Sequence, residues 1–583
     1  MSSASVVLLY NRSNSYGLAK DAKILEESLR AAGVYTIQHC DPLEPPQPVD
    51  IVFHLEQPSY VWMGWSRVNI LVVNPEWYVP ESYNAYMSKF DLVIFKNQSA
   101  KARFSGYLPE VKSLLLPWAL GSWTVEGVTP KETDARIGFA CFLGASKNRH
   151  AFFKKLLPFW RSTYPTLQVF SLFEVDVPEA ENIKVRVGDL DETQRYKMAT
   201  FFPGHIVCSD SEGYSYTAAE AEAVGAYSIH NAIEAFLNTY SGEIGVGWME
   251  HTQLASDPTH SYGLFSKIGE PEITQASLDR AIKNFMDADL SEVRKVRKER
   301  AIQRREAFNK EVASLVGTFS SMLSAKKKFA RPPILLPENC PPISIVTLLY
   351  GRKQFFDLAC HNIMISDYPK DKIEWILVDD SEEKDSEKIL KVAAAADPLK
   401  MVYVELGKKT PISEKRNIGV SKATNQIILM MDDDDHYPET SFRRRVAWLT
   451  LHPWTPQAVG CTTLACYDLV AAISSVNVPP FDIPLGQRIS EATLTFYKSW
   501  WEERSFATDI QIGEGEGFIR GRESQFLELP PQQIIVAFSH GQNTSSRRVP
   551  KEADVKPGCF WGFPREFLIF LHGLAGIKVK EEV

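Results

Sequence analysis

Acidic side chains at the end of an apolar run are the clearest candidates for chemistry in this 583-residue chain. The run Ile427–Met431 leads directly into Asp432–Asp435. A second apolar run, Trp375–Val378, leads into Asp379 and Asp380. Ligands of an open α/β sheet bind beyond the carboxyl ends of its strands. We therefore expect these carboxylates to meet at one edge of a sheet.

Clustered carboxylates suit a hard divalent cation, Mn²⁺ or Mg²⁺, that is bound together with the phosphates of a nucleotide. When the bond between a sugar and a nucleoside diphosphate breaks, negative charge develops on the departing diphosphate, and a cation offsets that charge. A further carboxylate can accept hydrogen bonds from the base or the ribose. The sequence therefore predicts a metal site of the kind that a reaction of a nucleotide sugar would require.

The segment 343–438 resembles the nucleotide-binding half of the inverting family 2 glycosyltransferases, which have the GT-A fold. The family's first strand, SIVTPTYNR, corresponds to Ser344–Arg352, and its VDDGSTD segment begins as Val378–Ser381 does. Its K/ARNxG segment corresponds to Lys415–Gly419, and its LDxDD segment to Met431–Asp435. The chain departs from the pattern in two places, because Leu-Leu replaces Pro-Thr in the first strand and the glycine after the VDDS segment is missing.

This resemblance implies a role for each matching residue. Asp380 would contact the base, Arg416 the nucleotide, and the pair Asp434 and Asp435 the metal and the diphosphate. The full set of donor-binding residues that it implies is Thr347, Tyr350, Arg352, Asp379, Asp380, Lys415, Arg416, Asp432 and Asp434. Some GT-A enzymes also use a late histidine beside the metal, so His540 is a third candidate metal ligand.

An inverting transferase also needs a general base that removes the proton of the acceptor hydroxyl. In family 2 this base is an Asp or Glu well beyond the metal motif, and the segment 508–521 supplies carboxylates there. Glu514 is the preferred candidate, Glu516 is the second and Asp509 the third. The family usually has a Glu-Asp pair at this point, from which Glu-Gly-Glu departs.

A second motif lies in the first half of the chain, where Glu212 and Glu220 are separated by seven residues. A turn at Glu212-Gly213 followed by a helix would place backbone amides where a diphosphate can bind. The segment 210–226 resembles the EGFGLPxLEAMAxG element of retaining GT-B glycosyltransferases. This resemblance implies that Glu220 contacts ribose hydroxyls. It also implies that the segment FLGASKNRH contacts the diphosphate through Gly144, Lys147 and Arg149.

The elements that position these residues alternate between apolar runs and helical patterns, which predicts an α/β fold. We expect a GT-B-like pair of Rossmann-type domains followed by a GT-A domain with a mixed sheet. The expected domains are 1–125, 126–328 with a long closing helix, a linker at 329–342, and 343–583. Five prolines between Arg331 and Pro342 indicate the linker. The closing helix covers Leu290 to Leu323, and we expect its basic face to be solvated.

Composition excludes several classes of protein. The net charge of −8 argues against a nucleic-acid partner, which would need a basic surface. Eight scattered cysteines form no CxxC pair, so neither a zinc ribbon nor a disulfide framework is expected. The N-terminus lacks a signal-peptide pattern, and no apolar run approaches the roughly 20 residues of a membrane span. We expect a cytoplasmic, soluble or membrane-peripheral protein of undetermined oligomeric state.

Three hypotheses about function remain open. The first is a bifunctional hexosyltransferase, in which an inverting GT-A site and a retaining GT-B site both act on a glycan, lipid-linked or protein-linked saccharide acceptor. The second keeps one active site, in the GT-A part, with a non-catalytic binding module before it. The third is a metal-dependent nucleotidyltransferase or phosphohydrolase. UDP is the expected donor nucleotide by analogy with other GT-A sites, and GDP and dTDP remain open.

Overall fold

The chain folds into two compact units, which we call unit 1 and unit 2. Unit 1 comprises Met1–Pro42, Val49–Ser59 and Ser66–Lys327, and unit 2 comprises Leu43–Pro48, Tyr60–Trp65 and Lys328–Val583. The computed structural model describes residues 4–13, 17–42, 44, 46–75, 78, 87, 89–105, 112–177, 181–207, 209, 212–249, 273–325, 334–452, 454–479, 483–508, 513–540, 543 and 563–577. Among these residues, no helix combines the length and the apolar character that crossing a bilayer requires.

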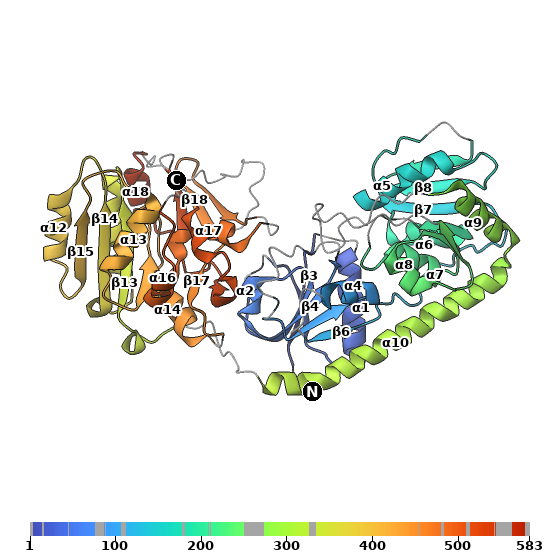
Figure 1. Ribbon diagram of the computed structural model, residues 1–583, viewed down its shortest axis with the longest axis horizontal. Coiled ribbons are helices and arrows are strands. Elements are labelled where there is room, and N and C mark those ends of the chain that lie inside the picture. The colour runs from blue at the N-terminus through green and yellow to red at the C-terminus, as the bar shows by residue number, and fades with distance from the viewer. Residues whose placement is uncertain are drawn as a thin grey trace. The chain divides into compact units, whose positions relative to one another are not determined.

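Unit 1 contains two six-stranded sheets, both entirely parallel (Figure 1). The first sheet runs, in spatial order, β2 (Ile37–Cys40), β1 (Val6–Leu9), β3 (Val49–Glu56), β4 (Ser66–Val73), β5 (Leu92–Phe95) and β6 (Ser113–Leu115). The second runs β12 (Val246–Met249), β11 (Tyr227–Asn231), β10 (Gly204–Val207), β7 (Phe139–Gly144), β8 (Leu167–Ser171) and β9 (Ile183–Val187). These sheets confirm the predicted pair of Rossmann-type folds.

Helices connect these strands and cover the sheets. They are α1 (Gly17–Ala31), α4 (Gln98–Ser105), α5 (Lys147–Leu156), α6 (Glu192–Phe201), α7 (Tyr216–Ala223), α8 (Glu234–Tyr240), α9 (Gln275–Asp287) and α10 (Leu290–Ser324), with the 3₁₀ turn η2 (Leu157–Phe159). The predicted long helix is α10, which contacts both α1 and α7. The prediction of a solvated basic face is wrong in part. Arg297 is buried and donates to the carbonyl of Gly245, and Arg304 pairs with Glu222.

Unit 2 is built on a seven-stranded mixed sheet and a smaller three-stranded sheet. The large sheet runs β15 (Lys400–Glu405), β14 (Ile373–Asp379), β13 (Ile343–Leu349), β16 (Ile427–Met430), β20 (Thr495–Tyr497), β17 (Ala458–Gly460) and β21 (Phe526–Glu528). The small sheet runs β19 (Ile473–Asn477), β18 (Leu464–Asp468) and β22 (Val536–Ser539). Because β20 is antiparallel to both β16 and β17, the large sheet is mixed, as predicted.

The helices of unit 2 are α2 (Tyr60–Met63), α11 (Phe356–Ile365), α12 (Ser386–Ala394), α13 (Ile412–Lys422), α14 (Ser441–Leu451), α15 (Leu485–Arg488), α16 (Lys498–Glu503), α17 (Glu514–Ile519) and α18 (Arg565–Leu574). Its 3₁₀ turns are η3 (Pro337–Asn339), η4 (Lys353–Phe355), η5 (Lys370–Lys372), η6 (Glu491–Thr493) and η7 (Glu523–Gln525). The described part of the predicted linker begins at residue 334, and its Leu335 and Cys340 are buried in the core of this unit.

The central strands β14, β13 and β16 are parallel neighbours, so their carboxyl ends lie at one edge of the sheet. Their side chains are almost entirely buried, as expected for strands that are covered on both faces. Helix α13 packs closely on β13 and β14 through Gly419, where no side chain intervenes. This arrangement brings the loops after β13, β14 and β16 together with the residues of α13.

Candidate functional site

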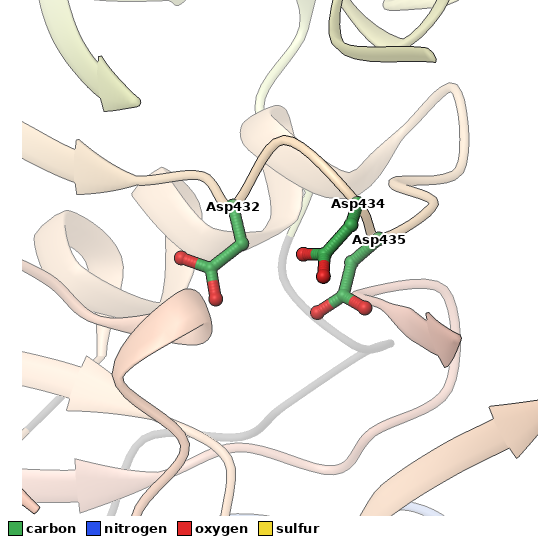
Figure 2. A group of neighbouring side chains, drawn as sticks. All are labelled: Asp432, Asp434 and Asp435. Atoms are coloured by element: carbon green, nitrogen blue, oxygen red, sulfur yellow. The ribbon is translucent and has the colours of Figure 1, made fainter. Parts of the chain in front are cut away.

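The loop that follows β16 holds a compact group of carboxylates. Asp432, Asp434 and Asp435 each offer a carboxylate oxygen, and these atoms lie within 4.8 Å of one another. Figure 2 shows the three carboxylates directed toward a common space on one side of the loop. Asp434 and Asp435 are buried, and Asp432 is half-buried. Buried carboxylate oxygens at this separation suit a hard divalent cation.

Contacts on both sides of the loop hold these carboxylates in place. The backbone N–H of Asp432 donates to the hydroxyl of Tyr437 at 2.9 Å, and the N–H of Phe538 donates to Asp435 Oδ1 at 2.9 Å. The backbones of His436 and Val536 exchange two hydrogen bonds, of 3.0 and 2.8 Å. These hydrogen bonds hold the acidic loop against β22, a strand of the small sheet.

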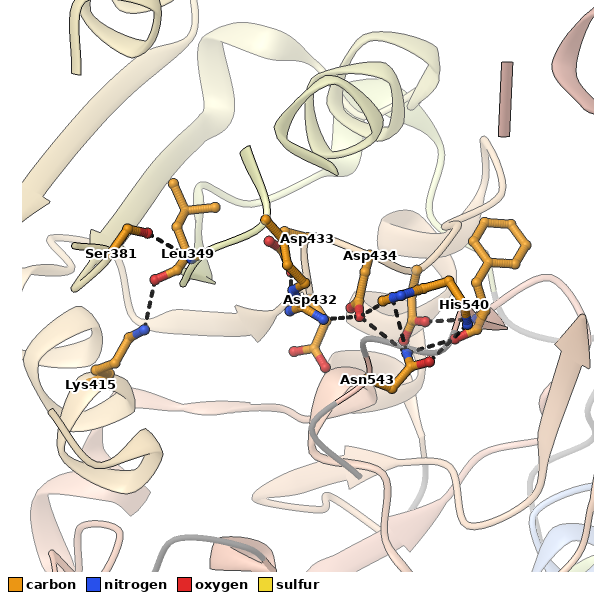
Figure 3. Close-up of polar contacts among 12 residues, drawn as sticks. Leu349, Ser381, Lys415, Asp432, Asp433, Asp434, His540 and Asn543 are labelled. Atoms are coloured by element: carbon orange, nitrogen blue, oxygen red, sulfur yellow. Dashed lines mark hydrogen bonds and ion pairs between the residues drawn. The ribbon is translucent and has the colours of Figure 1, made fainter. Parts of the chain in front are cut away.

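Three side chains from other described parts of unit 2 meet Asp434, and one of them, Asn543, donates from Nδ2 to Asp434 Oδ2 at 3.3 Å. The predicted ligand His540, which follows β22, places Nε2 at 3.0 Å from Asp434 Oδ2 (Figure 3). Arg352, after β13, forms ion pairs with Asp433 (2.7 Å) and Asp434. Although burial opposes its charge, Asp433 and Asp434 raise the pKa of this guanidinium. Burial raises the pKa of Asp433 to about 8, against the opposing effect of Arg352.

The two aspartates after β14 have different partners. Asp380, the predicted contact for the base, accepts hydrogen bonds from Lys415 and from the N–H of Thr410 (2.9 Å). Asp379 accepts from the hydroxyl of Tyr403 and from the N–H of Ser381, both at 2.9 Å. Both carboxylates are thus oriented before any ligand binds.

A pocket lies at the carboxyl ends of β13 and β14. Five of its lining residues are Tyr350, Arg352, Asp379, Ser381 and Asp433. The pocket therefore connects the end of β14 with the acidic loop.

Six of the nine predicted donor-binding residues are not part of this lining: Thr347, Asp380, Lys415, Arg416, Asp432 and Asp434. Thr347 is fully buried within the sheet, and its hydroxyl accepts from Trp375 Nε1 at 3.0 Å. Lys415 is buried beneath the pocket, where it also donates to the carbonyl of Leu349 at 2.8 Å (Figure 3). Thr347 and Lys415 therefore form hydrogen bonds with other residues of the protein, Trp375 and Leu349.

Arg416 links the acidic loop to the candidate base. Its Nε donates to Glu514 Oε1 at 2.7 Å, and its Nη2 lies 3.8 Å from Asp432 Oδ1. Arg416 is buried, and its Nη1 has no hydrogen-bond partner among the described residues. This nitrogen is an unpaired buried donor, of the kind that an anionic group such as a diphosphate oxygen satisfies.

Sequence analysis missed Glu491, which lies beside the candidate base. Its Oε1 accepts from the N–H of Gly515 at 3.0 Å, directly after Glu514 in α17. Burial raises the pKa of Glu491 to about 7, and the charge of Glu514 adds to that effect. Glu491 belongs to no motif that we identified, so no sequence signal pointed to it.

The other candidate bases are placed differently. Glu516 forms its ion pair with Arg520, an exposed residue one turn further along α17. It therefore lacks the buried guanidinium that Glu514 has. Asp509 lies outside the described residues.

The motif of unit 1 lies at the start of α7, where the hydroxyl of Ser215 caps the helix. Buried Glu220 is paired with Lys20 through one oxygen and with Arg195 (2.6 Å) through the other. Burial alone would raise its pKa, but Arg195 and Lys20 outweigh burial and lower it to about 2. Both oxygens that would contact a ribose are therefore engaged by cations.

Of the other residues predicted to bind a donor near α7, only Arg149 and Glu212 contact each other through their side chains among the described residues. Arg149 reaches Glu212 at 3.3 Å, and Gly213 continues the turn before α7. Gly144 ends β7 with a φ of 56°, a left-handed conformation that glycine adopts freely. The side chain of Lys147 lies outside the described part of the chain.

Comparison with known proteins identifies one family. The profile of "Glycosyl transferase family 2" matches residues 344–454, the segment that carries the acidic loop, so the chain contains a glycosyltransferase domain. No curated protein matches the chain.

Several solved structures resemble part of the chain at low scores. One is the mannosyltransferase PcManGT from Pyrobaculum calidifontis in complex with GDP-Man and Mn²⁺, at 19% identity and a TM-score of 0.28, over 38% of this chain and 63% of that one. Another is residues 1–349 of TarS from S. aureus, at 14% identity and a TM-score of 0.29, over 34% of this chain and 60% of that one. The match thus spans less than two thirds of either structure.

Proposed function

We propose that unit 2 transfers a sugar from a nucleoside diphosphate donor, UDP-linked, to a saccharide-bearing acceptor, with inversion at the transferred sugar. The observation that supports this proposal most directly is the convergence of Asp432, Asp434 and Asp435 beside a pocket at the ends of β13 and β14. The matched family profile covers the same loop.

The residues present fit a divalent cation. Three carboxylate oxygens within 4.8 Å of one another provide the hard ligands that Mn²⁺ and Mg²⁺ prefer. Asp434 and Asp435 would hold the ion, with His540 as a further ligand because its Nε2 already lies beside Asp434. When bound, such an ion stabilises negative charge on the departing diphosphate.

The residues of the chain itself account for orientation and for proton transfer. The base would lie in the pocket beside Asp379, with the diphosphate extending toward Arg416 Nη1. Glu514 would accept the proton of the acceptor hydroxyl at Oε2, since Oε1 is occupied by Arg416. Arg416 would thus contact the departing group on one side and orient the general base on the other.

For unit 1 the contacts of Glu220 favour a non-catalytic role. A retaining transferase of GT-B type would need that carboxylate to bind ribose, yet both oxygens form ion pairs with Lys20 and Arg195. We therefore prefer a single active site in unit 2, with unit 1 as a binding module. A second transferase site in unit 1 would require the ion pairs of Glu220 with Lys20 and Arg195 to break.

A donor screen on the full chain tests the proposal. UDP- and GDP-sugars would be supplied with Mn²⁺, and release of the nucleoside diphosphate would be measured with and without oligosaccharide acceptors. We expect diphosphate release that EDTA abolishes and that Asp434→Asn/Asp435→Asn reduces about 1,000-fold. Glu387→Gln on the exposed face of α12 serves as the matched control. Acceptor-independent formation of free sugar 1-phosphate would instead identify a phosphohydrolase.

A further inference from the structure

Glu491 and Glu514 form a buried pair of like charges with one guanidinium between them and the acidic loop. Glu491 lies in η6, Glu514 in the first turn of α17, and Arg416 in α13. These three elements are distant in the sequence and meet only in the fold. The arrangement places a second carboxylate behind the residue that we propose as the general base.

The contact between η6 and α17 is unusually close. A Cβ at Gly515 would lie 2.9 Å from Glu491 Oε1 and 3.2 Å from its Cγ, so any other residue there would displace the Glu491 side chain. The N–H of Gly515 donates to that same oxygen at 3.0 Å. The N–H groups of a first helical turn have no partner within the helix, and a carboxylate is a favourable acceptor for them. Glu491 therefore fixes the turn from which Glu514 projects.

We propose that Glu491 is a positioning residue for Glu514: its carboxylate holds the first turn of α17 and, together with Arg416, sets the charge around the general base. This inference rests on the proposed function of unit 2 and deepens it. The titratable and charged groups that face Glu491 are Glu514 on α17 and Arg416 on α13. The negative charge of Glu514 favours uptake of a proton by the buried Glu491, and the positive charge of Arg416 opposes it.

Burial raises the pKa of Glu491 to about 7, so this carboxylate titrates near neutral pH. A proton taken up by Glu491 neutralises the carboxylate that accepts from the Gly515 N–H, and so weakens its hold on the turn that carries Glu514. In wild type, kcat/KM for the donor should therefore fall as the pH drops through about 7. With Glu491→Gln, the amide oxygen still accepts from Gly515, but the like charge is gone.

The first test is the pH profile of UDP-sugar hydrolysis with Mn²⁺. We expect Glu491→Gln to move the acid limb of kcat/KM at least one pH unit lower than in wild type. The exposed control Glu502→Gln on α16 should leave the profile unchanged. A Glu491→Gln profile that keeps its acid limb, with activity reduced equally at every pH, would show that Glu491 has only a structural role and would overturn the proposal.

The second test does not depend on turnover, and so separates this inference from the proposed function. Glycine-selective ¹⁵N labelling of the full chain reports on the Gly515 amide, assigned by comparison with Gly515→Ala. We expect its chemical shift to titrate near pH 7 in wild type and to be flat in Glu491→Gln. A flat shift in wild type between pH 5.5 and 8.5 would refute the inference even for an active enzyme. A clear titration in a protein that releases no nucleotide would refute only the proposed function.

Discussion

Gly419 of α13 lies directly against Val346 of β13, so that a Cβ on the glycine would come within 2.4 Å of Val346 Cγ1. Val378 Cγ2 on the neighbouring strand would lie at 3.3 Å. Helix α13 can approach the sheet this closely only because residue 419 has no side chain. Since Lys415 and Arg416 lie on the same helix, this contact determines how far they stand from the acidic loop.

Gly419→Ala should therefore weaken both stability and activity. Adding a methyl group to a fully packed contact costs about 2 kcal/mol, so the midpoint of thermal unfolding should fall by several degrees. Displacement of Arg416 should also reduce kcat for donor hydrolysis. Gly407→Ala is the matched control, because a methyl group added there would meet no atom within 4 Å. Equal stability of the two variants would contradict the packing argument.

The choice between the two glutamates of α17 is open to a direct measurement. Glu514→Gln should lower kcat about 1,000-fold, since a general base contributes on that scale. The KM for the donor should change little, because Glu514 is assigned to the acceptor side. Glu516→Gln should stay within about twofold of wild type, since its partner Arg520 is exposed. The opposite ranking would transfer the role of general base to Glu516.

Cation binding should be visible in thermal unfolding without any substrate. A ligand that binds only the folded state at about 100 times its Kd stabilises that state by about 2.7 kcal/mol. We expect Mn²⁺ to raise the Tm of wild type relative to EDTA. The double variant Asp434→Asn/Asp435→Asn should show no rise, and Glu387→Gln should respond as wild type does. A metal-dependent rise that persists in the double variant would place the cation elsewhere.

The ion pairs of Glu220 predict a pH dependence in unit 1. Its folded-state pKa of about 2 lies below the ordinary value of 4.5, so the pairs stabilise the fold above pH 4.5. That contribution is lost as the pH falls from 4.5 toward 2. At pH 7, wild type should be about 3 kcal/mol more stable to urea than Glu220→Gln.

The control for this comparison is Glu299→Gln, which removes an exposed carboxylate of α10. It should leave the unfolding curve unchanged at pH 7. A difference between wild type and Glu220→Gln that persists undiminished at pH 2.5 would show that the ion pairs are not its source. Loss of one of two glycosidic products in Glu220→Gln would revive the hypothesis of a second active site.

Much of the frame of unit 2 could be predicted from local pattern. The apolar runs at Ile343–Tyr350 and Ile427–Met431 are β13 and β16 to within one residue, because continuous apolar residues are typical of strands buried on both faces. The carboxylates after β14 and β16 were predicted to lie at one edge of the sheet, and Asp379 and Asp433 line one pocket there. The strands and the carboxylates that follow them could be predicted because each is recognised from residues close together in the sequence.

The partners of those residues could not be predicted in the same way. Glu491 meets Gly515, and Tyr403 meets Asp379, through contacts that exist only once the strands are ordered in the sheet. The ion pairs of Glu220 illustrate the same limit, because Lys20 lies 200 residues away in the chain. A motif shows which residues are available for chemistry, whereas tertiary packing decides whether their oxygens are free.

The contacts of strand β22 restrict where residues can be inserted or deleted without displacing His540. The strand is tied to the acidic loop at Val536 and Phe538, and His540 is the next even-numbered position. Along an extended chain, side chains alternate between two sides, so a single inserted or deleted residue after Val536 would turn the imidazole away from Asp434. Insertions that preserve this histidine should therefore come in pairs, or fall beyond residue 540.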